Sequence, residues 1–531
     1  MSKQILEEFI ALLDTKQTKE IRISLSQSSG EKEPKAPTKK TEGTKQKTTR
    51  KSTRELAEDN KLLLLFNLLT SNKSYSREVM IKKLYPEKNS PNAYDNLRKR
   101  LIKHIQNHLF AQLVTDDKFK VGTVFGMILL AFQLSGQRAK AVMRYLLEKS
   151  EIYAIELRLY NVLDGIYDLQ EQYAVMLDLD LNEIVRKRTI NDALYDKMRK
   201  VKRALTEMQL LATEARRQLV FPELSTLIEK ALKNQQLTST DTDNPAIQVR
   251  IVSIFRTAYM SSKAYHMLEP FLLERYNVLK QREAFGKGDM EHELSFLYMI
   301  SHVYYRTSKF NLAGEWLKKM KELLLTTLSP NHIYVLKHKA LSAAIYSATG
   351  KNELAIECSK EALKQRPKSH EMTEWLNLEL SLAVYYFEGK QYRKCIRTLH
   401  AISSYDLDLE EELGPEWSFK MDLIGVLAQY ENGDPEYALR LIKSMKIKFK
   451  DFLGKNQYLN ANTFINFITK VIQNPDIVKD TRFRKQLKEI SEEWEHSQGH
   501  DLQAVRFFCW LKSKMHNRDY YELLVEELAK G

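Results

Sequence analysis

Residues 340–367, ALSAAIYSATGKNELAIECSKEALKQRP, decide the expected fold of this chain. Apolar residues recur at helical spacing on both sides of residues 349–351, which indicates two helices joined by a tight turn. Small residues, Ala343, Ala355 and Ala362, stand where two packed helices approach most closely. Two amphipathic helices cannot bury both apolar faces alone, so the pair is expected to stack on neighbours.

Neighbouring segments repeat this pattern. The small residue that follows each turn recurs at Ala313, Ala355, Cys395 and Ala438, in steps of 42, 40 and 43 residues. A fifth, more distant copy is expected at Phe132, Gly136, Ala141 and Tyr145. The alternative that stays open is an irregular helical domain in which these spacings arise by chance.

Tyr346, four residues before Gly350, and Pro367, at the end of the unit, complete the pattern. Together with the small residues, they resemble the tetratricopeptide repeat (TPR), whose usual period is ~34 residues. The units here are longer, as in TPR variants whose helices gain about a turn. The resemblance implies an all-α, TPR-like α-solenoid with a repeat step of about 40–43 residues.

The domain organisation predicted from the sequence has six parts. They are a short N-terminal helix and extended segment (1–26), a basic disordered linker (27–54), a small helical head (55–121), a helical repeat-like region (122–235), the TPR-like array (246–479) and C-terminal capping helices (480–531). Within the first part, residues 20–26 alternate like a strand. Residues 27–54 carry no large apolar residue, so they cannot offset the entropy of ordering.

Composition favours a soluble cytoplasmic protein. The net charge is +14, of which residues 30–54 contribute +6 through nine basic and three acidic residues. This excess suggests an acidic partner, with nucleic acid as one alternative. Three widely spaced cysteines fit a reducing compartment, and no segment resembles a signal peptide. Residues 121–137 are uncharged but short for a membrane span, so a buried helix and no membrane partner are expected.

The head is expected to hold three helices. Ser76 is the predicted N-cap of the second, and Pro91 starts the third, on which apolar residues step by four. Residues 75–109 faintly resemble the winged-helix head of bacterial regulators that carry TPR-type arrays. The resemblance implies DNA contact by Arg98, Lys99 and Lys103 on the third helix, and a β-hairpin over residues 112–121. The same stretch reads equally well as a helix end, a loop and a helix start. The alternative for the head is a structural cap for the solenoid.

No constellation for catalysis emerges from the sequence. Gly286-Lys287-Gly288 lacks the rest of a phosphate-binding loop, and the pair His496 and His500 has no third ligand nearby. We therefore expect no enzyme activity, no metal and no cofactor.

The remaining candidate is a binding groove. In TPR arrays the inner face of each first helix holds the ligand, and the resemblance carries this role to eight positions. They are Tyr298, His302, Tyr305, Arg306, Lys337, Asn377, Lys420 and Tyr430. The leading hypothesis is a scaffold that binds a peptide or partner protein in a concave face. The alternatives are a transcriptional regulator whose head (55–121) binds DNA while the array senses a partner, and RNA binding along a basic surface.

Overall fold

The computed structural model is helical throughout its described secondary structure, and no strand occurs among the residues it describes. These are residues 5–530 apart from 8, 11–12, 14, 30–52, 72–74, 87–89, 116–119, 135–138, 219–227, 229–230, 238–243, 262–263, 328–332, 365–371, 405–412, 454–458 and 498–501. The chain divides into two compact units, residues 1–154 with 172–179 and residues 155–171 with 180–531. The all-α prediction is confirmed.

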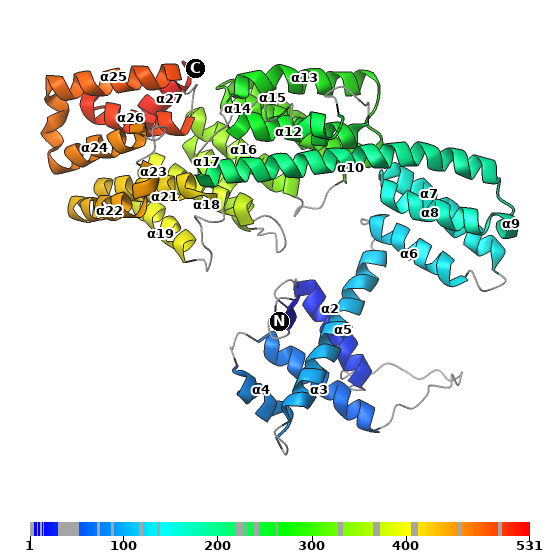
Figure 1. The fold of residues 1–531 in the computed structure, drawn as a ribbon. Helices are drawn as coiled ribbons and strands as arrows, with labels where there is room; N and C mark the ends of the chain where they lie inside the picture. The colour runs from blue at the N-terminus through cyan, green and yellow to red at the C-terminus, as the bar shows by residue number, and fades with distance from the viewer. Residues whose placement is uncertain are drawn as a thin grey trace, which may run out of the picture. The chain divides into compact units, whose positions relative to one another are not determined.

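Four helices of the first unit form the N-terminal head (Figure 1): α2 (Thr15–Ser29), α3 (Thr53–Leu69), α4 (Arg77–Leu84) and α5 (Pro91–Thr115). Ser76 caps α4 as predicted, because its hydroxyl accepts a hydrogen bond from the Val79 N–H at 3.4 Å. Leu97, Leu101 and Ile105, spaced by four along α5, are buried in one core. The predicted three-helix pattern of residues 55–109 is therefore present.

The strand expected over residues 20–26 is wrong, because α2 covers this segment. Ile21 and Leu25, four residues apart, lie on one side of the helix and are buried in the head core. Ile23, which lies between them in the strand-like alternation, is 40% exposed. The four-residue spacing of Ile21 and Leu25 therefore matches the helix that forms, and the two-residue alternation does not. Residues 30–52, most of the predicted disordered linker, lie outside the described residues.

Of the two readings of residues 112–121, the β-hairpin is wrong wherever the structure describes this segment, and a helix end followed by a helix start agrees with it. α5 continues to Thr115, and α6 (Lys120–Leu134) begins after the undescribed residues 116–119. α5 and α6 pack very closely, because a Cβ on Gly122 would lie 2.1 Å from the carbonyl oxygen of Leu113. The resemblance to a winged helix therefore ends at the third helix of the head.

The fifth repeat copy is not supported by α6 and α7 (Lys140–Glu156). Ala141 and Tyr145 are exposed, whereas the matching positions downstream, such as Ala355 and Ser359, are buried. Phe132 is exposed, whereas its counterpart Tyr346 is partly buried, and Gly136 lies outside the described residues. α6 is the helix expected at residues 121–137, but only part of its surface is buried. Within the described part of the chain, no helix has both the length and the apolar character needed to cross a bilayer.

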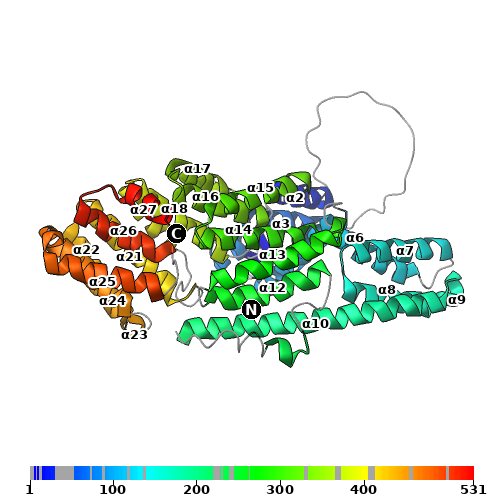
Figure 2. The ribbon, with the colours of Figure 1, turned by 90° about the horizontal axis from the view of Figure 1, so that it is seen from above.

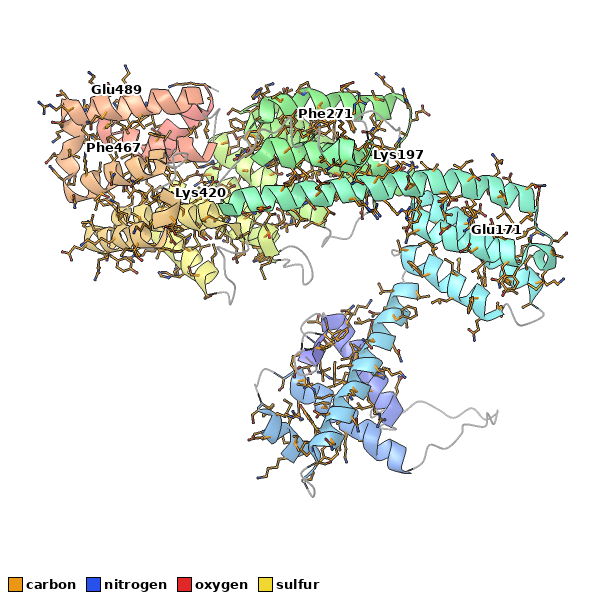
Figure 3. The ribbon with its side chains drawn as sticks, viewed as in Figure 1. Glu171, Lys197, Phe271, Lys420, Phe467 and Glu489 are labelled. Atoms are coloured by element: carbon orange, nitrogen blue, oxygen red, sulfur yellow. The ribbon has the colours of Figure 1, made fainter. Side chains whose placement is uncertain are left out.

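The second unit begins with α8 (Tyr160–Gln172), of which residues 160–171 belong to it, and α10 (Leu181–Gln218). α10 lies beside α12 (Pro245–Ser261), as Figures 1 and 2 show. Lys197 projects from α10 in Figure 3. α13 (Tyr265–Gln281) follows α12 and packs on it.

The loop between α13 and α14 is tied to the start of α8. Arg158 forms a two-bonded ion pair with Asp289, at 2.6 Å for each bond, and also donates to the carbonyl of Ala284. A Cβ on Gly288 would lie 1.8 Å from the carbonyl oxygen of Glu156, so glycine is required by this close approach. Gly288 therefore has a packing role in this loop.

Four consecutive helix pairs occupy residues 290–448, and we refer to them as the four-pair array. The pairs are α14 (Met290–Arg306) with α15 (Phe310–Thr327), α16 (Ile333–Ala348) with α17 (Asn352–Lys364), α18 (Met372–Glu388) with α19 (Tyr392–Ser403), and α21 (Pro415–Glu431) with α22 (Pro435–Lys448). Each first helix also contacts the first helix of the next pair.

The turn within each pair has the same geometry. The second residue after each first helix adopts a left-handed conformation: Ser308 (φ 59°), Gly350 (φ 81°), Lys390 (φ 56°) and Gly433 (φ 93°). In every case the next N–H donates to a carbonyl five residues earlier, for example Lys351 to Tyr346 at 2.8 Å. The small residues that follow, Ala313, Ala355, Cys395 and Ala438, are fully buried.

The chain after the array folds back on it. α23 (Lys450–Leu453), α24 (Leu459–Gln473) and α25 (Thr481–Ser497) extend the unit, and α26 (Leu502–His516) and α27 (Tyr520–Leu528) return to the ends of the first helices. Tyr521 donates to the carbonyl of Ser347 at 2.7 Å, and Trp510 donates to Glu431 at 2.6 Å. The last two helices therefore cross the array at its turns, which differs from the terminal cap expected for residues 480–531.

Candidate functional site

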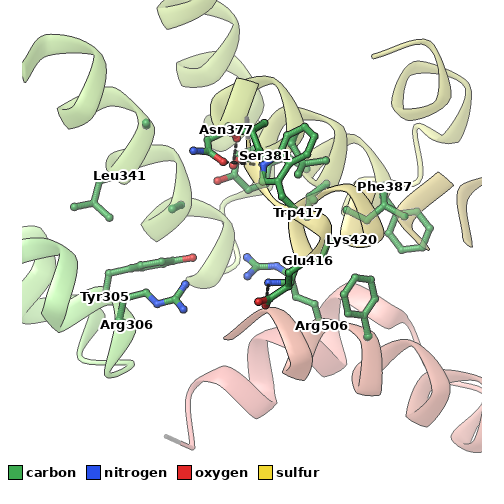
Figure 4. Close-up of a pocket in the computed structure, with 18 of the residues that line it drawn as sticks. Tyr305, Arg306, Leu341, Asn377, Ser381, Phe387, Glu416, Trp417, Lys420 and Arg506 are labelled. Atoms are coloured by element: carbon green, nitrogen blue, oxygen red, sulfur yellow. Dashed lines mark hydrogen bonds and ion pairs between the residues drawn. The ribbon is translucent and has the colours of Figure 1, made fainter. Parts of the chain in front are cut away.

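A cavity of about 460 Å³ lies between the first helices of the four-pair array and the returning C-terminal helices (Figure 4). Figure 4 shows Tyr305 and Arg306 on one side of this space and Trp417 and Lys420 on the other, with Arg506 below them. Its size is within the range of small-molecule and side-chain pockets. All of its lining residues belong to the second unit.

Six of the eight residues predicted for the groove line this cavity. They are Tyr298, His302, Tyr305, Arg306, Asn377 and Lys420. The other two lie elsewhere: Lys337 is paired with Glu374 at 3.6 Å, and Tyr430 packs edge-on against Trp510 at 5.8 Å between ring centroids. Lys337 remains close, because its partner Glu374 lines the cavity.

The apolar wall of the cavity depends on small residues in α16. Ala340 and Ala344, four residues apart, line the cavity on the same side of this helix and leave space that larger side chains would fill. Leu380 and Val384, with the same spacing on α18, supply a further apolar surface. Spacing along two helices therefore creates room for an apolar group.

Polar side chains border the apolar wall and are held by one another. Trp417 donates its indole N–H to the side-chain oxygen of Asn377 at 2.9 Å. Ser381 donates to the backbone carbonyl of Asn377 at 2.7 Å, and Lys420 pairs with Glu416 at 2.6 Å. These contacts fix the rotamers of side chains that face the cavity, which favours recognition of a ligand with one shape.

Cationic groups gather at the α14 end of the cavity. Burial lowers the pKa of His302 well below its ordinary value, and the charges of Arg256, Arg306 and Lys337 lower it further. The imidazole is therefore neutral near pH 7. Arg306 donates to the Tyr265 hydroxyl at 2.6 Å. This end of the cavity therefore combines a neutral histidine with fixed positive charge.

The C-terminal helices complete the cavity through residues that the sequence reasoning missed. Arg506, Phe507 and Tyr520 line it, and Arg506 forms a buried ion pair with Glu388 at 2.9 Å. The Ser347 hydroxyl donates to the same Glu388 at 2.6 Å. The available signal was Arg506 within the otherwise apolar run VRFFCWL, because an arginine among buried apolar residues needs a partner.

The thiols near the array are not suited to nucleophilic chemistry. Burial raises the pKa of Cys395 to about 12 and that of Cys358 to about 11, so both are protonated at neutral pH. Cys395 and Cys509 are buried, as predicted, and Cys358 is partly buried.

Of the three residues proposed for DNA contact, Arg98 is wrongly assigned. It is 6% exposed and makes two hydrogen bonds of 2.7 Å to the Glu7 carboxylate inside the head. Burial alone would raise the pKa of Glu7, but bonds from Arg98 and the backbone bring the net pKa below its ordinary value. Lys99 and Lys103 are exposed on α5.

Comparison with known proteins adds no family assignment. No protein-family model matches the chain, and no curated protein or solved structure matches it significantly.

Proposed function

We propose that the protein is a non-enzymatic, TPR-like scaffold that binds an extended segment of a partner protein in the cavity of the four-pair array. The observation that carries this proposal is the convergence of six predicted groove residues from α14, α18 and α21 on one cavity. These positions were taken from the resemblance to TPR arrays, and their convergence supports a common inner face.

The chemistry of the lining indicates the kind of segment. The space beside Ala340 and Ala344 accepts a bulky apolar side chain, and aromatic rings such as Trp417 supply contact area at low entropic cost. The cationic α14 end favours an acidic group on the same segment. A peptide with an apolar anchor followed by an acidic residue is the expected ligand.

The arrangement of the polar groups supports binding over catalysis. Lys420 is paired with Glu416, and Arg506 with Glu388, so each charge already has a counter-charge. His302 has its pKa lowered and lies among cations, with no carboxylate shown to orient it as a base. These features supply contact and shape and give no support to a reaction.

A peptide-display selection on the immobilised full-length protein tests this function. We expect selected peptides to share the apolar-acidic pattern and to lose affinity by at least about tenfold on Ala344→Arg, which fills the cavity. Ser381→Arg, on a different helix, should have the same effect. Glu357→Arg, an exposed residue of α17, is the matched control and should leave affinity unchanged.

Two outcomes would count against the scaffold. In the first, no peptide family emerges from the selection. In the second, the selected peptides bind Ala344→Arg and Ser381→Arg as tightly as the native protein, which would place their site outside the cavity.

A further inference from the structure

Three cationic side chains from three different helices lie near one histidine at the α14 end of the cavity. Arg256 lies on α12, Arg306 on α14 and Lys337 on α16. The charges of all three lower the pKa of His302. Like charges that gather in a partly buried place repel one another, and a bound anion relieves that repulsion. This cluster is therefore a candidate site for a negatively charged group.

The ring of Tyr298 is the common neighbour of the cluster. The guanidinium carbon of Arg256 lies 5.9 Å from the centre of this ring, and Nζ of Lys337 lies 5.5 Å from it. The imidazole of His302 stacks on the same ring, with 5.9 Å between the ring centroids and 29° between the planes. One aromatic ring therefore holds two cations and the histidine close together.

Two nitrogen atoms of the cluster are closed to solvent and have no hydrogen-bond partner among the residues that the structure describes. They are Nε of Arg256 and Nδ1 of His302. The guanidinium Nε always carries a hydrogen, and a neutral imidazole can donate from Nδ1. Buried donors are normally satisfied, so an anion that accepts from both would correct an unfavourable arrangement.

Lys337 supplies a third donor, which is held only loosely. Its Nζ is 3.6 Å from the Glu374 carboxylate, beyond ordinary hydrogen-bond distance, and its side chain is 20% exposed. Donors from α12, α14 and α16 approach from different directions, which suits the three oxygens of a phosphate monoester better than a planar carboxylate. A phosphate monoester also carries about 1.5 to 2 negative charges at pH 7, so it neutralises more of the cluster.

The place of the cluster in the cavity indicates what carries the phosphate. Tyr298 and His302 line the same cavity as Ala340 and Ala344, whose small side chains leave room for an apolar group. A segment that places an apolar side chain beside the two alanines can therefore reach the cluster with a second side chain.

We propose that Arg256, His302 and Lys337 bind a phosphate monoester, and that this group is a phosphorylated side chain of the partner segment. The choice of carrier rests on the scaffold function proposed above, whereas the phosphate site rests on the cluster itself.

Line broadening of phenyl phosphate in ³¹P NMR spectra of the full-length protein tests the site without a peptide. We expect the native protein to broaden the line. Arg256→Gln should weaken binding by at least about tenfold, because a charged donor is lost. The matched control is Arg440→Gln. Arg440 is an exposed arginine of α22 that also lies over a tyrosine ring, 5.2 Å from the centre of Tyr437, and its variant should bind like the native protein.

Glu374→Gln should change the affinity in the opposite direction. It removes the carboxylate that competes for Lys337, so phenyl phosphate should bind about threefold more tightly. A variant that only disturbed the fold would bind more weakly, so tighter binding identifies a direct electrostatic effect. The phosphate site is overturned if the native protein does not broaden the line, if Arg256→Gln binds equally well, or if Glu374→Gln binds no more tightly.

Degenerate peptide libraries passed over the immobilised full-length protein test the carrier. Each library has phosphoserine, phosphotyrosine, glutamate or serine fixed at its centre. One of the two phosphorylated libraries should be retained at least about tenfold better than the glutamate and serine libraries, and Arg256→Gln should abolish this preference.

The two experiments separate the phosphate site from the scaffold. If glutamate peptides are retained as well as phosphorylated ones, the scaffold stands and the phosphorylated carrier is overturned. If phenyl phosphate binds but no library is retained, the phosphate site stands, and both the scaffold and the proposed carrier are overturned.

Discussion

The four-pair array and residues 120–156 share the same spacing of small residues in the sequence. They differ in whether those small residues are buried in the structure. In the array, Ala313, Ala355 and Ala438 are fully buried directly after left-handed turns. In the earlier segment, Ala141 occupies the matching place and is exposed. A small residue at the right spacing therefore forms a repeat only where a neighbouring helix packs against it.

The two regions also use their apolar residues differently. In the array, each first helix contacts the next, so its apolar residues contribute to continuous cores. α6 packs closely on α5, but its Phe125 and Leu129 remain about half exposed.

The largest expected difference concerns the two arginine–glutamate pairs. Glu388 is inaccessible and holds the buried Arg506, whereas Glu7, the partner of Arg98, is 45% exposed. Glu388→Ala should destabilise the array by about 4 kcal/mol, because it leaves a buried guanidinium without its counter-charge. Glu7→Ala should cost about 1 kcal/mol, since water can reach the vacated site.

Different probes can follow these two pairs. All five tryptophans lie between residues 316 and 510, so urea unfolding followed by tryptophan fluorescence reports on the second unit. Amide hydrogen exchange in α5 reports on the head. Equal losses of stability for Glu388→Ala and Glu7→Ala would contradict the distinction between a pair that is closed to solvent and a pair that solvent can reach.

The second prediction compares the small residue of a packed repeat, Ala355, with its exposed counterpart, Ala141. Ala355→Leu should destabilise the array by about 3 kcal/mol, because a fully buried alanine leaves no space for three more carbons. Ala141→Leu should change stability by less than about 0.5 kcal/mol, since that side chain is exposed. Urea unfolding measures the first, and hydrogen exchange in α7 the second. If Ala141→Leu lowers the free energy of unfolding as much as Ala355→Leu does, the predicted fifth repeat at residues 132–145 would be supported.

Local periodicity explains which parts of the fold were predictable. The small residues and turns of the four pairs recur at steps of 40 to 43 residues, so the helix pairs could be expected from spacing. The resemblance to TPR arrays then pointed to six residues that line the cavity. The segment around Ile21 was misread because Ile21, Ile23 and Leu25 fit a strand as well as Ile21 and Leu25 fit a helix. Only the tertiary core decides between the two.

Long-range pairing explains what the sequence did not reveal. Arg98 looked like a DNA contact because its partner, Glu7, is 91 residues away. Arg506 enters the cavity through a bond to Glu388, 118 residues earlier in the chain. No local pattern encodes such a pairing, so the C-terminal wall of the cavity was missed.

The third prediction concerns the loop that precedes the array. Burial raises the pKa of Asp289, but bonds from His292 and Arg158 outweigh it, so the net pKa falls to about 2. Because the folded-state pKa lies below the unfolded value of about 3.9, this carboxylate stabilises the fold above pH ~4 and loses that effect as pH falls toward 2.

Asp289→Asn should therefore cost about 2 kcal/mol at pH 7, and less as the pH approaches 2. The measurement is urea unfolding at several pH values between 7 and 3, followed by tryptophan fluorescence. Glu291→Gln, on the first turn of α14, is the control for a nearby carboxylate. A difference from the native protein that stays constant across this range would show that Asp289 acts through shape alone.

The smallest expected effect tests the turns themselves. Gly350→Ala should destabilise the array by about 1 kcal/mol, because φ is 81° there and a non-glycine residue is strained. The new methyl group would lie 3.8 Å from Val525, an ordinary contact, so the cost is in the backbone. Ser308 adopts φ 59° at the matching turn, so Ser308→Gly should relieve strain and be neutral or stabilising by up to about 1 kcal/mol. Urea unfolding of both variants should give shifts of opposite sign or a loss at Gly350 alone. If Ser308→Gly lowers the free energy of unfolding as much as Gly350→Ala does, the two turns are not energetically equivalent. Backbone strain at the left-handed residue would then not explain the stability of both turns.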